Sequence, residues 1–411
     1  MKSNRDSPRT ASIPRGLGIT QAGALLNQGV AAHQAGRLQD AERLYRKVLA
    51  LDDRLADAHH LLGLALHQQG RSRDGIGSIE RAIARAPQSP AYQLSRGAVL
   101  ASAGLLAEAS GAFRRALVSK PGDGLAFRNL ATAALGIDQP ETALTASRRS
   151  SALAPRDPVT WTARAHAARR LDRRDEAIAA SRQAIDLDPA ADEARFILAS
   201  LEGTPDRPPA GYVRDLFDKF APHFDRDLVG KLDYRTPDAL AALIARHLSP
   251  GPKSMTILDL GCGTGLAGVA LKPLAKRMVG LDLSPAMLAE AKRRKLYAEL
   301  VEGDLVTAKF ASTFTLVVAA DVLNYLGDLA PAFGAIDAAM APGSAFAFSI
   351  ETGGAEDSYR LTSDLRYAHA PDHVRALAAE RRWVEVAAEA AVLRRQGDTP
   401  VEGVLFLFRK D

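Results

Sequence analysis

Cysteine is almost absent from this sequence of 411 residues, and no spacing of metal ligands occurs in it. The one cysteine, Cys262, excludes an internal disulfide and any zinc site built from a cysteine cluster. We therefore expect a protein of a reducing compartment, the cytoplasm, that holds no metal ion. Because Cys262 lies inside a glycine-rich loop, we interpret it as part of that loop rather than as a nucleophile.

Long apolar runs and strong charge are also missing. No stretch approaches the roughly 20 apolar residues that span a bilayer, and residues 1–21 lack the apolar core of a signal peptide. The net charge is only +5, and the basic surplus lies toward the N-terminus. We expect no membrane partner, and a surplus this weak does not favour nucleic acid as a ligand. We expect residues 1–21 to be a disordered N-terminal segment, and the length predicts at least two domains.

A period of 34 residues runs through the first half of the chain. Prolines mark it at one position, namely Pro87, Pro121, Pro155 and Pro189. Two rows of small residues share it: Gly29, Gly63, Gly97, Ala131, Ala165 and Ala199, and Ala41, Gly75, Ala109, Ala143 and Ala177. Small residues allow two helices to approach closely, and a proline ends a helix, so the repeating unit is helix, turn, helix. Larger side chains take the inward position of the second helix: Tyr45, Ile79 and Phe113.

This pattern resembles the tetratricopeptide repeat. It predicts an all-α solenoid over 22–203, with five repeats to about residue 190 and a capping helix at 192–202. By the resemblance, the concave face comes from the first helix of each repeat, which would expose His33, His60, His67, Arg128, His166, Arg169 and Arg170. This face is either a groove for an acidic or polar protein partner or ordinary solvated surface.

Prolines and glycine in residues 203–209 interrupt regular structure, so we place a linker at 204–211 and a second domain at 212–411. A helix with an aromatic side is expected within 212–225, and a second helix is expected within 237–248. A strand (254–260), a loop rich in glycine (261–265) and a helix (266–274) follow. Glycines in such a turn let a ligand approach the backbone near the free N–H groups of the helix.

Three further strands end at small or acidic residues. The segments 277–282, 298–302 and 314–319 lead to Asp282, to Gly303 and Asp304, and to Ala320 and Asp321, respectively. A carboxylate after the second strand is placed to accept the hydroxyls of a ribose. Open parallel sheets bind ligands at this edge, so these residues predict one cofactor site.

Two cofactors suit such a site: a nicotinamide dinucleotide and S-adenosylmethionine. A nicotinamide-dependent oxidoreductase would share the ribose carboxylate, but its loop usually reads Gly-x-Gly-x-x-Gly. Here the loop is Gly-x-Gly-x-Gly, and Asp259 precedes it by two residues. A carboxylate there would repel a pyrophosphate, whereas it can help to hold the ammonium of S-adenosylmethionine.

The segment Leu258 to Gly265 resembles the first motif of the class I S-adenosylmethionine-dependent methyltransferases. The resemblance implies a Rossmann-like α/β domain whose mostly parallel sheet ends in an antiparallel C-terminal hairpin. It also implies these cofactor-binding residues: Asp259, Gly261, Cys262, Gly263, Asp282, Leu283, Met287, Asp304, Leu305, Ala320 and Asp321. Relatives often carry tyrosines at the positions of Phe217 and Phe224, and Tyr212 or Arg235 can substitute for the missing hydroxyl.

Tetratricopeptide repeats joined to such a domain resemble the predicted TPR-repeat methyltransferases of bacteria. We expect methyl transfer to an acceptor that the sequence does not name, with the repeats recruiting a protein or shaping access for the acceptor. The alternative is an interaction protein whose second domain binds S-adenosylmethionine without turnover.

A catalytic base is needed only where the acceptor must lose a proton. Our candidates lie beyond the strand ends: Glu351 after the fifth strand (345–350), and Tyr367 and His369 before a helix that starts near Pro371. His369 is the first choice because imidazole titrates near neutrality, although it also suits a surface position before that helix. Arg394 and Arg395, before the final strand, either meet an acidic substrate or are solvated.

Overall fold

The computed structural model describes the backbone of residues 15–203, 205–231, 234–354, 356, 358–396 and 399–411. Side chains are described from residue 21 onward in these ranges, except at 227, 229–231 and 396. The chain divides into two compact units, Met1–Leu171 (unit 1) and Asp172–Asp411 (unit 2). The segment predicted to be disordered lies outside the described residues up to residue 14, and from Arg15 onward it belongs to the first helix.

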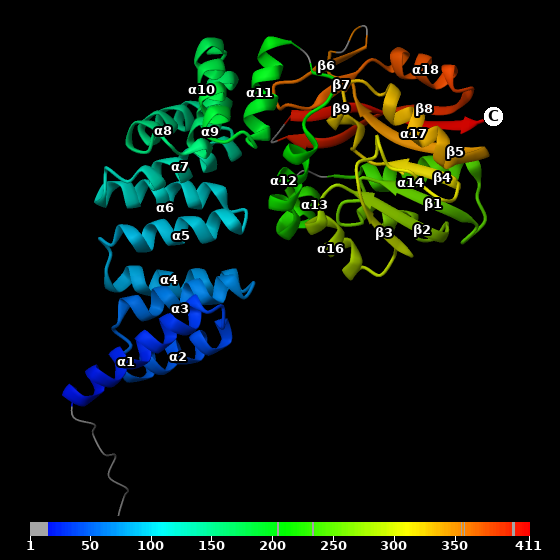
Figure 1. Ribbon diagram of the computed structural model, residues 1–411. Helices are drawn as coiled ribbons and strands as arrows, with labels where there is room; N and C mark the ends of the chain where they lie inside the picture. Colours follow the sequence, from blue (N-terminus) through cyan, green and yellow to red (C-terminus); the bar gives the residue numbers. More distant parts are fainter. Residues whose placement is uncertain (1–14, 204, 232–233, 355, 357, 397–398) are drawn as a thin grey trace, which may run out of the picture. The chain divides into compact units, whose positions relative to one another are not determined.

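Unit 1 is a stack of helix pairs, as predicted from the 34-residue period (Figure 1). Its helices are α1 (Arg15–Gln34), α2 (Leu38–Leu51), α3 (Ala56–Gln68), α4 (Ser72–Arg85), α5 (Pro90–Ser102), α6 (Leu106–Ser119), α7 (Gly124–Gly136), α8 (Pro140–Leu153) and α9 (Pro158–Arg170). The turn inside each pair requires one residue with positive φ. Glycine supplies it at Gly36, Gly70 and Gly104, while Asp138 and Asp172 have φ of 58° and 54° at the same position of the period.

The small residues of the period meet the large ones. A Cβ atom on Gly97 in α5 would lie 2.4 Å from the ring of Phe113 in α6, and Gly29 and Gly63 stand in the same relation to Tyr45 and Ile79. The contact joins residues 16 positions apart in every case. Each glycine is therefore required by the bulk of its partner, because a side chain there would overlap a buried ring or branched chain.

The α7–α8 repeat solves the same packing problem with different residues. Its small residue is Ala131, the residue 16 positions later is Ser147, and this serine is fully buried. A gain of one methyl group on the first helix is thus matched by a smaller side chain on the second. This exchange keeps the helix pair close at similar total volume.

Unit 2 begins with helices that the sequence assigned to the repeats. Its helices are α10 (Arg174–Leu187), α11 (Asp192–Glu202), α12 (Ala210–Phe220), α13 (Phe224–Lys231), α14 (Thr236–Leu248), α15 (Leu266–Leu271), α16 (Pro285–Arg293), α17 (Ala330–Ala339) and α18 (Pro371–Glu380). The division between compact units falls at Leu171, upstream of the predicted linker. The domain limits 22–203, 204–211 and 212–411 therefore stay a prediction.

A mostly parallel sheet forms the centre of unit 2, as the sequence predicted. Its strands are β1 (Met255–Leu260), β2 (Ala275–Asp282), β3 (Glu299–Glu302), β4 (Phe314–Ala319), β5 (Met340–Glu351), β6 (Tyr359–Leu361), β7 (Tyr367–His369), β8 (Trp383–Gln396) and β9 (Thr399–Lys410). The order is β3-β2-β1-β4-β5-β7-β6, and the antiparallel pair β8–β9 joins β5 through β9. The chain runs from β1 to β2 and β3 on one side and returns to β4 on the other, which makes a switch point between β1 and β4.

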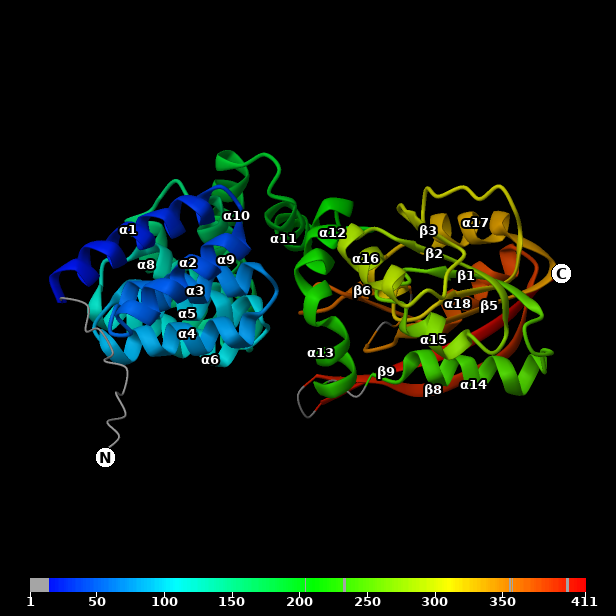
Figure 2. The ribbon, with the colours of Figure 1, turned by 90° about the horizontal axis from the view of Figure 1, so that it is seen from below.

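Helices cover both faces of this sheet (Figure 2). One core joins α17 and α18 to the sheet through Phe333, Val374 and Phe348, and the other joins α14 to it through Leu243 and Ile257. Both faces of the parallel strands are therefore buried, which is the usual state of a parallel sheet. Across the described ranges, no helix is both long and apolar enough to cross a bilayer.

We predict that Gly97→Ala destabilises unit 1. The added methyl group overlaps the buried Phe113 ring, so the free energy of unfolding should fall by about 1–3 kcal/mol. Gly77→Ala in α4 is the matched control, because no heavy atom lies within 4 Å of its new Cβ; helix propensity predicts a gain of up to about 1 kcal/mol there. Urea unfolding followed by far-ultraviolet circular dichroism measures both. Equal midpoints for the two variants would contradict the packing argument.

Candidate functional site

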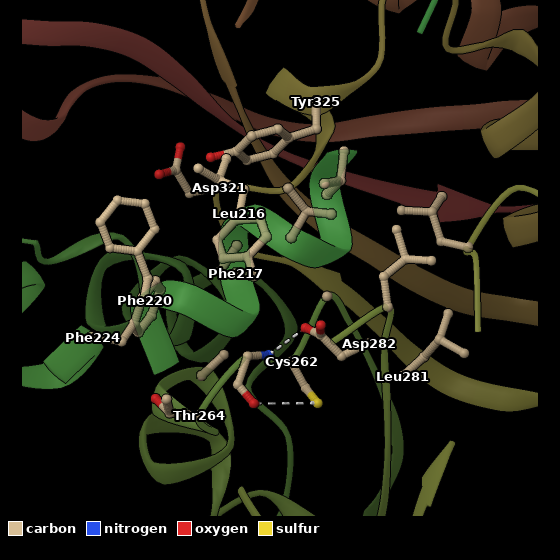
Figure 3. A pocket seen from close by; sticks show the side chains of 18 of the residues that line it. Leu216, Phe217, Phe220, Phe224, Cys262, Thr264, Leu281, Asp282, Asp321 and Tyr325 are labelled. Atoms are coloured by element: carbon tan, nitrogen blue, oxygen red, sulfur yellow. Dashed lines mark hydrogen bonds between the residues drawn. The ribbon is translucent and has the colours of Figure 1, made fainter. Parts of the chain in front are cut away.

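A cavity of about 310 Å³ lies in unit 2 at the carboxyl ends of the parallel strands (Figure 3). Residues that follow β1, β2, β3 and β4 all line it. The cavity thus opens at the switch point between β1 and β4, where ligands bind in open α/β sheets.

The glycine loop after β1 forms one wall of this cavity. Gly261 and Gly263 have φ of 61° and 53°, a conformation that favours glycine. A Cβ atom on Gly261 would lie 2.6 Å from Val322, which follows β4. The loop can therefore pass this close to the β4 end only with glycine at 261. Cys262 also lines the cavity, and burial raises the pKa of its thiol, so it is a neutral wall residue.

Asp282 lies at the end of β2 beside this loop. Its Oδ2 accepts a hydrogen bond from the Gly263 N–H at 2.8 Å, and its Oδ1 accepts one from the Ser284 N–H at 2.8 Å. Burial raises the pKa of Asp282, while these two bonds act in the opposite direction. Ser284 in turn caps α16 by accepting a bond from the Met287 N–H. The cap fixes the backbone that positions the carboxylate.

The end of β3 supplies the next part of the wall. Asp304 accepts a bond from the Val306 N–H at 3.0 Å and pairs with Arg207 at 2.9 Å. Leu283 and Leu305 line the same part of the cavity, as does Arg207. Met287, predicted to flank the cofactor, is fully buried and is absent from the described lining.

Asp259 lies behind the loop rather than in the cavity. Its Oδ2 accepts a bond from the Tyr297 hydroxyl at 2.6 Å, and only 1% of the residue is exposed. Burial raises the pKa of Asp259 to about 7, with the Tyr297 bond lowering it and the nearby Asp282 raising it further. The structure thus gives this carboxylate a contact with Tyr297, which the sequence reading missed, in place of direct access to a ligand.

Four charged residues gather where β4 ends. The Asp321 carboxylate accepts bonds from Arg394 Nη1 at 3.1 and 3.2 Å, from Arg366 Nη2 at 3.2 Å and from Asn324 Nδ2 at 2.7 Å. Glu351 accepts a bond from Arg394 Nη2 at 2.7 Å and lies 2.9 Å from Arg366 Nε. We call Asp321, Glu351, Arg366 and Arg394 the charge quartet.

The quartet is formally neutral and mostly shielded from water. Arg394 is 8% exposed in its side chain and Arg366 is 19% exposed. The Arg366 guanidinium also lies 4.8 Å from the ring centroid of Tyr325, which strengthens its position through a cation–π contact. Asp321, Arg366 and Arg394 line the cavity, whereas Glu351 lies behind them.

The two aromatic candidates for catalysis are placed away from the cavity. His369 is fully buried in β7, its Nε2 lies 3.1 Å from the Gly327 carbonyl oxygen, and burial lowers its pKa to about 4. Tyr367 is also fully buried and donates its hydroxyl to the Pro205 carbonyl at 2.6 Å. Neither is in the described lining of the cavity. We do not carry forward a catalytic role for either of them.

Apolar side chains from α12 and α13 cover the cavity. Those in its lining are Val213, Leu216, Phe217, Phe220, Phe224 and Leu228. In Figure 3, Phe217 lies between Tyr325 and Asp282. Tyr212 packs on Phe196, with ring centroids 5.3 Å apart, and Arg235 is exposed. Neither is in the described lining, so their substitution for the tyrosine hydroxyls that relatives carry at positions 217 and 224 stays a prediction.

Two tyrosines that the sequence reading did not single out also line the cavity. Tyr234 donates its hydroxyl to the Ala320 carbonyl at 3.3 Å, and burial raises its pKa. The Tyr325 hydroxyl donates to none of the described residues, and burial raises its pKa as well. No periodicity marks either tyrosine, because Tyr325 ends a 3-10 helix of only three residues, Leu323–Tyr325, and Tyr234 lies between two helices.

Family models match both parts of the chain. A model described as a methyltransferase domain matches residues 257–343. Models described as tetratricopeptide repeats match residues 24–57, 60–124 and 159–190.

Curated relatives match the part of the chain that holds the cavity. Methyltransferase-like protein 27 of Homo sapiens is 35% identical over 109 residues, 26% of this chain and 43% of that protein. Ribosomal protein L11 methyltransferase of Thermus thermophilus is 36% identical over 155 residues, 36% of this chain and 56% of that protein. Trans-aconitate 2-methyltransferase of Variovorax paradoxus is 34% identical over 166 residues, 39% and 58% of the two chains. The chain thus spans about half the length of these relatives.

Solved structures similar to this chain are of two kinds. The N-methyltransferase NodS from Bradyrhizobium japonicum, in complex with S-adenosyl-L-homocysteine, is 24% identical, with a TM-score of 0.34 over 42% of this chain and 86% of that one. YrrB, a TPR protein with an unusual peptide-binding site, is 18% identical, with a TM-score of 0.40 over 45% of this chain and 97% of that one.

We predict that Tyr297→Phe destabilises unit 2 more at pH 8 than at pH 5. The pKa of Asp259 is about 7 in the folded protein and near 4 in the unfolded chain. Protonation of Asp259 therefore favours the folded state; this contribution is complete below about pH 4 and is lost as the pH rises through 7. Removing the hydroxyl leaves the charged carboxylate without its partner, which should cost about 1–3 kcal/mol at pH 8 and less at pH 5.

Urea unfolding at both pH values measures this effect. Asp259→Asn with Tyr297→Phe is the control, because it carries no titrating group at 259 and should show a smaller difference between the two pH values. An equal loss of stability at pH 5 and pH 8 for Tyr297→Phe alone would contradict the assignment.

Proposed function

We propose that this chain, in which tetratricopeptide repeats precede a methyltransferase domain, transfers the methyl group of S-adenosylmethionine to an acceptor that binds beside Asp321. One observation carries the proposal. The glycine loop after β1 and the carboxylates after β2, β3 and β4 line a single cavity at the switch point of the sheet. Methyltransferase relatives over the same segment support it.

The residues in the β1–β3 half of the cavity fit this cofactor. Each oxygen of Asp282 accepts one backbone bond, which leaves each a lone pair for a ribose hydroxyl. Asp304 has the same capacity for the adenine amine, and Leu283 and Leu305 supply apolar contact to the ring. Gly261 and Gly263 expose backbone to the methionine part without a side chain in the way.

When bound, S-adenosylmethionine supplies a methyl group on a positively charged sulfur. The chain's own contribution is to hold the two reactants in line and to keep water out. The apolar cover from α12 and α13 excludes water from the cavity. Ala320 and Asp321 border the point where the two halves of the cavity meet, so they position the methyl group against the acceptor.

The role of the repeats is the second part of the proposal. We assign to the concave side of unit 1 the recruitment of a protein, which is either the acceptor or a factor that delivers it. A photo-crosslinking residue at Arg128, on a first helix of the repeats, should capture a protein from extract. The same residue at the exposed Glu108, on a second helix, is the control and should capture none; absence of an adduct at 128 would contradict the assignment.

Asp282→Ala should weaken the binding of S-adenosylmethionine about tenfold or more. The carboxylate supplies both ribose contacts in the proposal, and its loss also releases the Gly263 N–H. Isothermal titration of the full chain measures the dissociation constant. Glu290→Ala on α16 is the matched control, because Glu290 is partly exposed, pairs with Arg293 and is not in the described lining of the cavity.

Titration and a methyl-transfer assay together separate two alternatives. Affinity for NAD with none for S-adenosylmethionine would identify an oxidoreductase and overturn the proposal. Tight binding of S-adenosylmethionine with no methyl transfer to any component of extract would identify a binding protein without turnover.

A further inference from the structure

The cavity has two chemically different halves. The β1–β3 half holds the carboxylates of Asp282 and Asp304, whose neighbours are backbone N–H groups and Arg207. The half beyond β4 holds guanidinium groups and phenol hydroxyls from Arg366, Arg394, Tyr234 and Tyr325. If the cofactor occupies the first half, the acceptor meets the second.

The second half has many donors and no available base. Histidine, lysine and glutamate are absent from the described lining of the cavity. Asp321 is the carboxylate in this half, and its two oxygens already accept four bonds from Arg366, Arg394 and Asn324. A carboxylate has about four lone-pair sites, so Asp321 has none left for a proton from the acceptor.

Several donors in this half remain unused. The Tyr325 hydroxyl and Arg366 Nη1 donate to none of the described residues, although both residues line the cavity. Arg366 Nε lies 2.9 Å from Glu351 but is not aligned for a hydrogen bond. Because the charge quartet is neutral as a whole, an anion that approaches these donors meets no net negative charge.

We propose that the methyl acceptor is a carboxylate, held by Arg366 and the Tyr325 hydroxyl beside Arg394. This inference rests on the proposed function and names its substrate class. A guanidinium recognises a carboxylate through paired N–H groups, and a neutral phenol adds a third donor. The occupant of this half is therefore an organic acid or an acidic side chain.

The reaction balances without a base. A carboxylate oxygen forms a bond to the methyl carbon while the carbon–sulfur bond breaks, and the bonding pair goes to sulfur. The products are a methyl ester and a neutral thioether, so one positive and one negative charge disappear and no proton is released. A protonated amine, a hydroxyl or a thiol must lose a proton first, which this lining does not accept.

The test uses the full chain, tritiated methyl-S-adenosylmethionine and cell extract. Methyl esters of carboxylates release volatile methanol in mild alkali, whereas methyl groups on nitrogen, sulfur or ether oxygen stay bound. We expect most of the transferred label to be alkali-labile. Label that is stable to alkali overturns the carboxylate assignment and leaves the proposed methyl transfer standing, while no label in any fraction overturns both.

Chemical blocking of the same extract gives a second measurement that needs no variant. Conversion of carboxylates to amides with a carbodiimide and an amine should abolish labelling, and acetylation of amines should leave it. The reverse pattern identifies an amine acceptor and overturns the proposal.

Arg366→Lys then tests the binding residue. Lysine keeps the charge opposite Asp321 but loses the paired N–H groups, so the apparent KM for the alkali-labile pool should rise about tenfold. The affinity for S-adenosylmethionine should stay within about twofold. Arg375→Lys, in an exposed ion pair with Asp372 and Glu385, should change neither. An unchanged KM in Arg366→Lys, or loss of cofactor binding alone, overturns the assignment of Arg366.

Discussion

The charge quartet is the interaction on which the shape of the cavity depends. Asp321 follows β4, Glu351 ends β5, Arg366 precedes β7 and Arg394 belongs to β8. Charges removed from water are costly unless they are paired, so these four side chains are stable there only together. Their pairing holds the antiparallel C-terminal hairpin against the carboxyl ends of the parallel strands. Ion pairs therefore determine the shape of the cavity beyond β4, whereas the backbone of the loops after β1, β2 and β3 determines the shape of the other half.

The two halves could be predicted from the sequence to different degrees. The glycine loop, Asp282 and Asp304 follow directly from the alternation of short strands and turns, because each contact is made by the residues next to a strand end. The quartet joins residues 45, 73 and 43 positions apart, and no local pattern encodes such pairs. The sequence indicated Glu351 and Arg394 as separate candidates, but it did not indicate that these two side chains pair with each other.

Asp259 and His369 show what a series of strand ends does not predict. Residue type and closeness to a strand end indicate both as site residues, and both are almost completely buried. Alternation along a strand sends one side chain toward the ligand edge and its neighbour into a core, and the sequence alone does not say which. In contrast, the 34-residue period predicted the helix pairs well because the first three repeats form the same contact, from Gly29 with Tyr45 to Gly97 with Phe113.

Tyr367 contacts both the predicted linker (204–211) and the predicted capping helix (192–202), and these contacts join the two segments to unit 2. Its hydroxyl binds the Pro205 carbonyl, and Phe196 of α11 packs 6.5 Å from its ring and 5.3 Å from that of Tyr212. A terminal repeat helix usually presents a polar outer side to water, but α11 buries Phe196 to 1% exposure instead. Asp206 adds to this contact by accepting the N–H of Gly327 at 2.7 Å. The last repeat helix thus shares its core with the domain that holds the cavity, and because Tyr367 lies in β7, directly after Arg366, this packing supports the strand that positions the guanidinium.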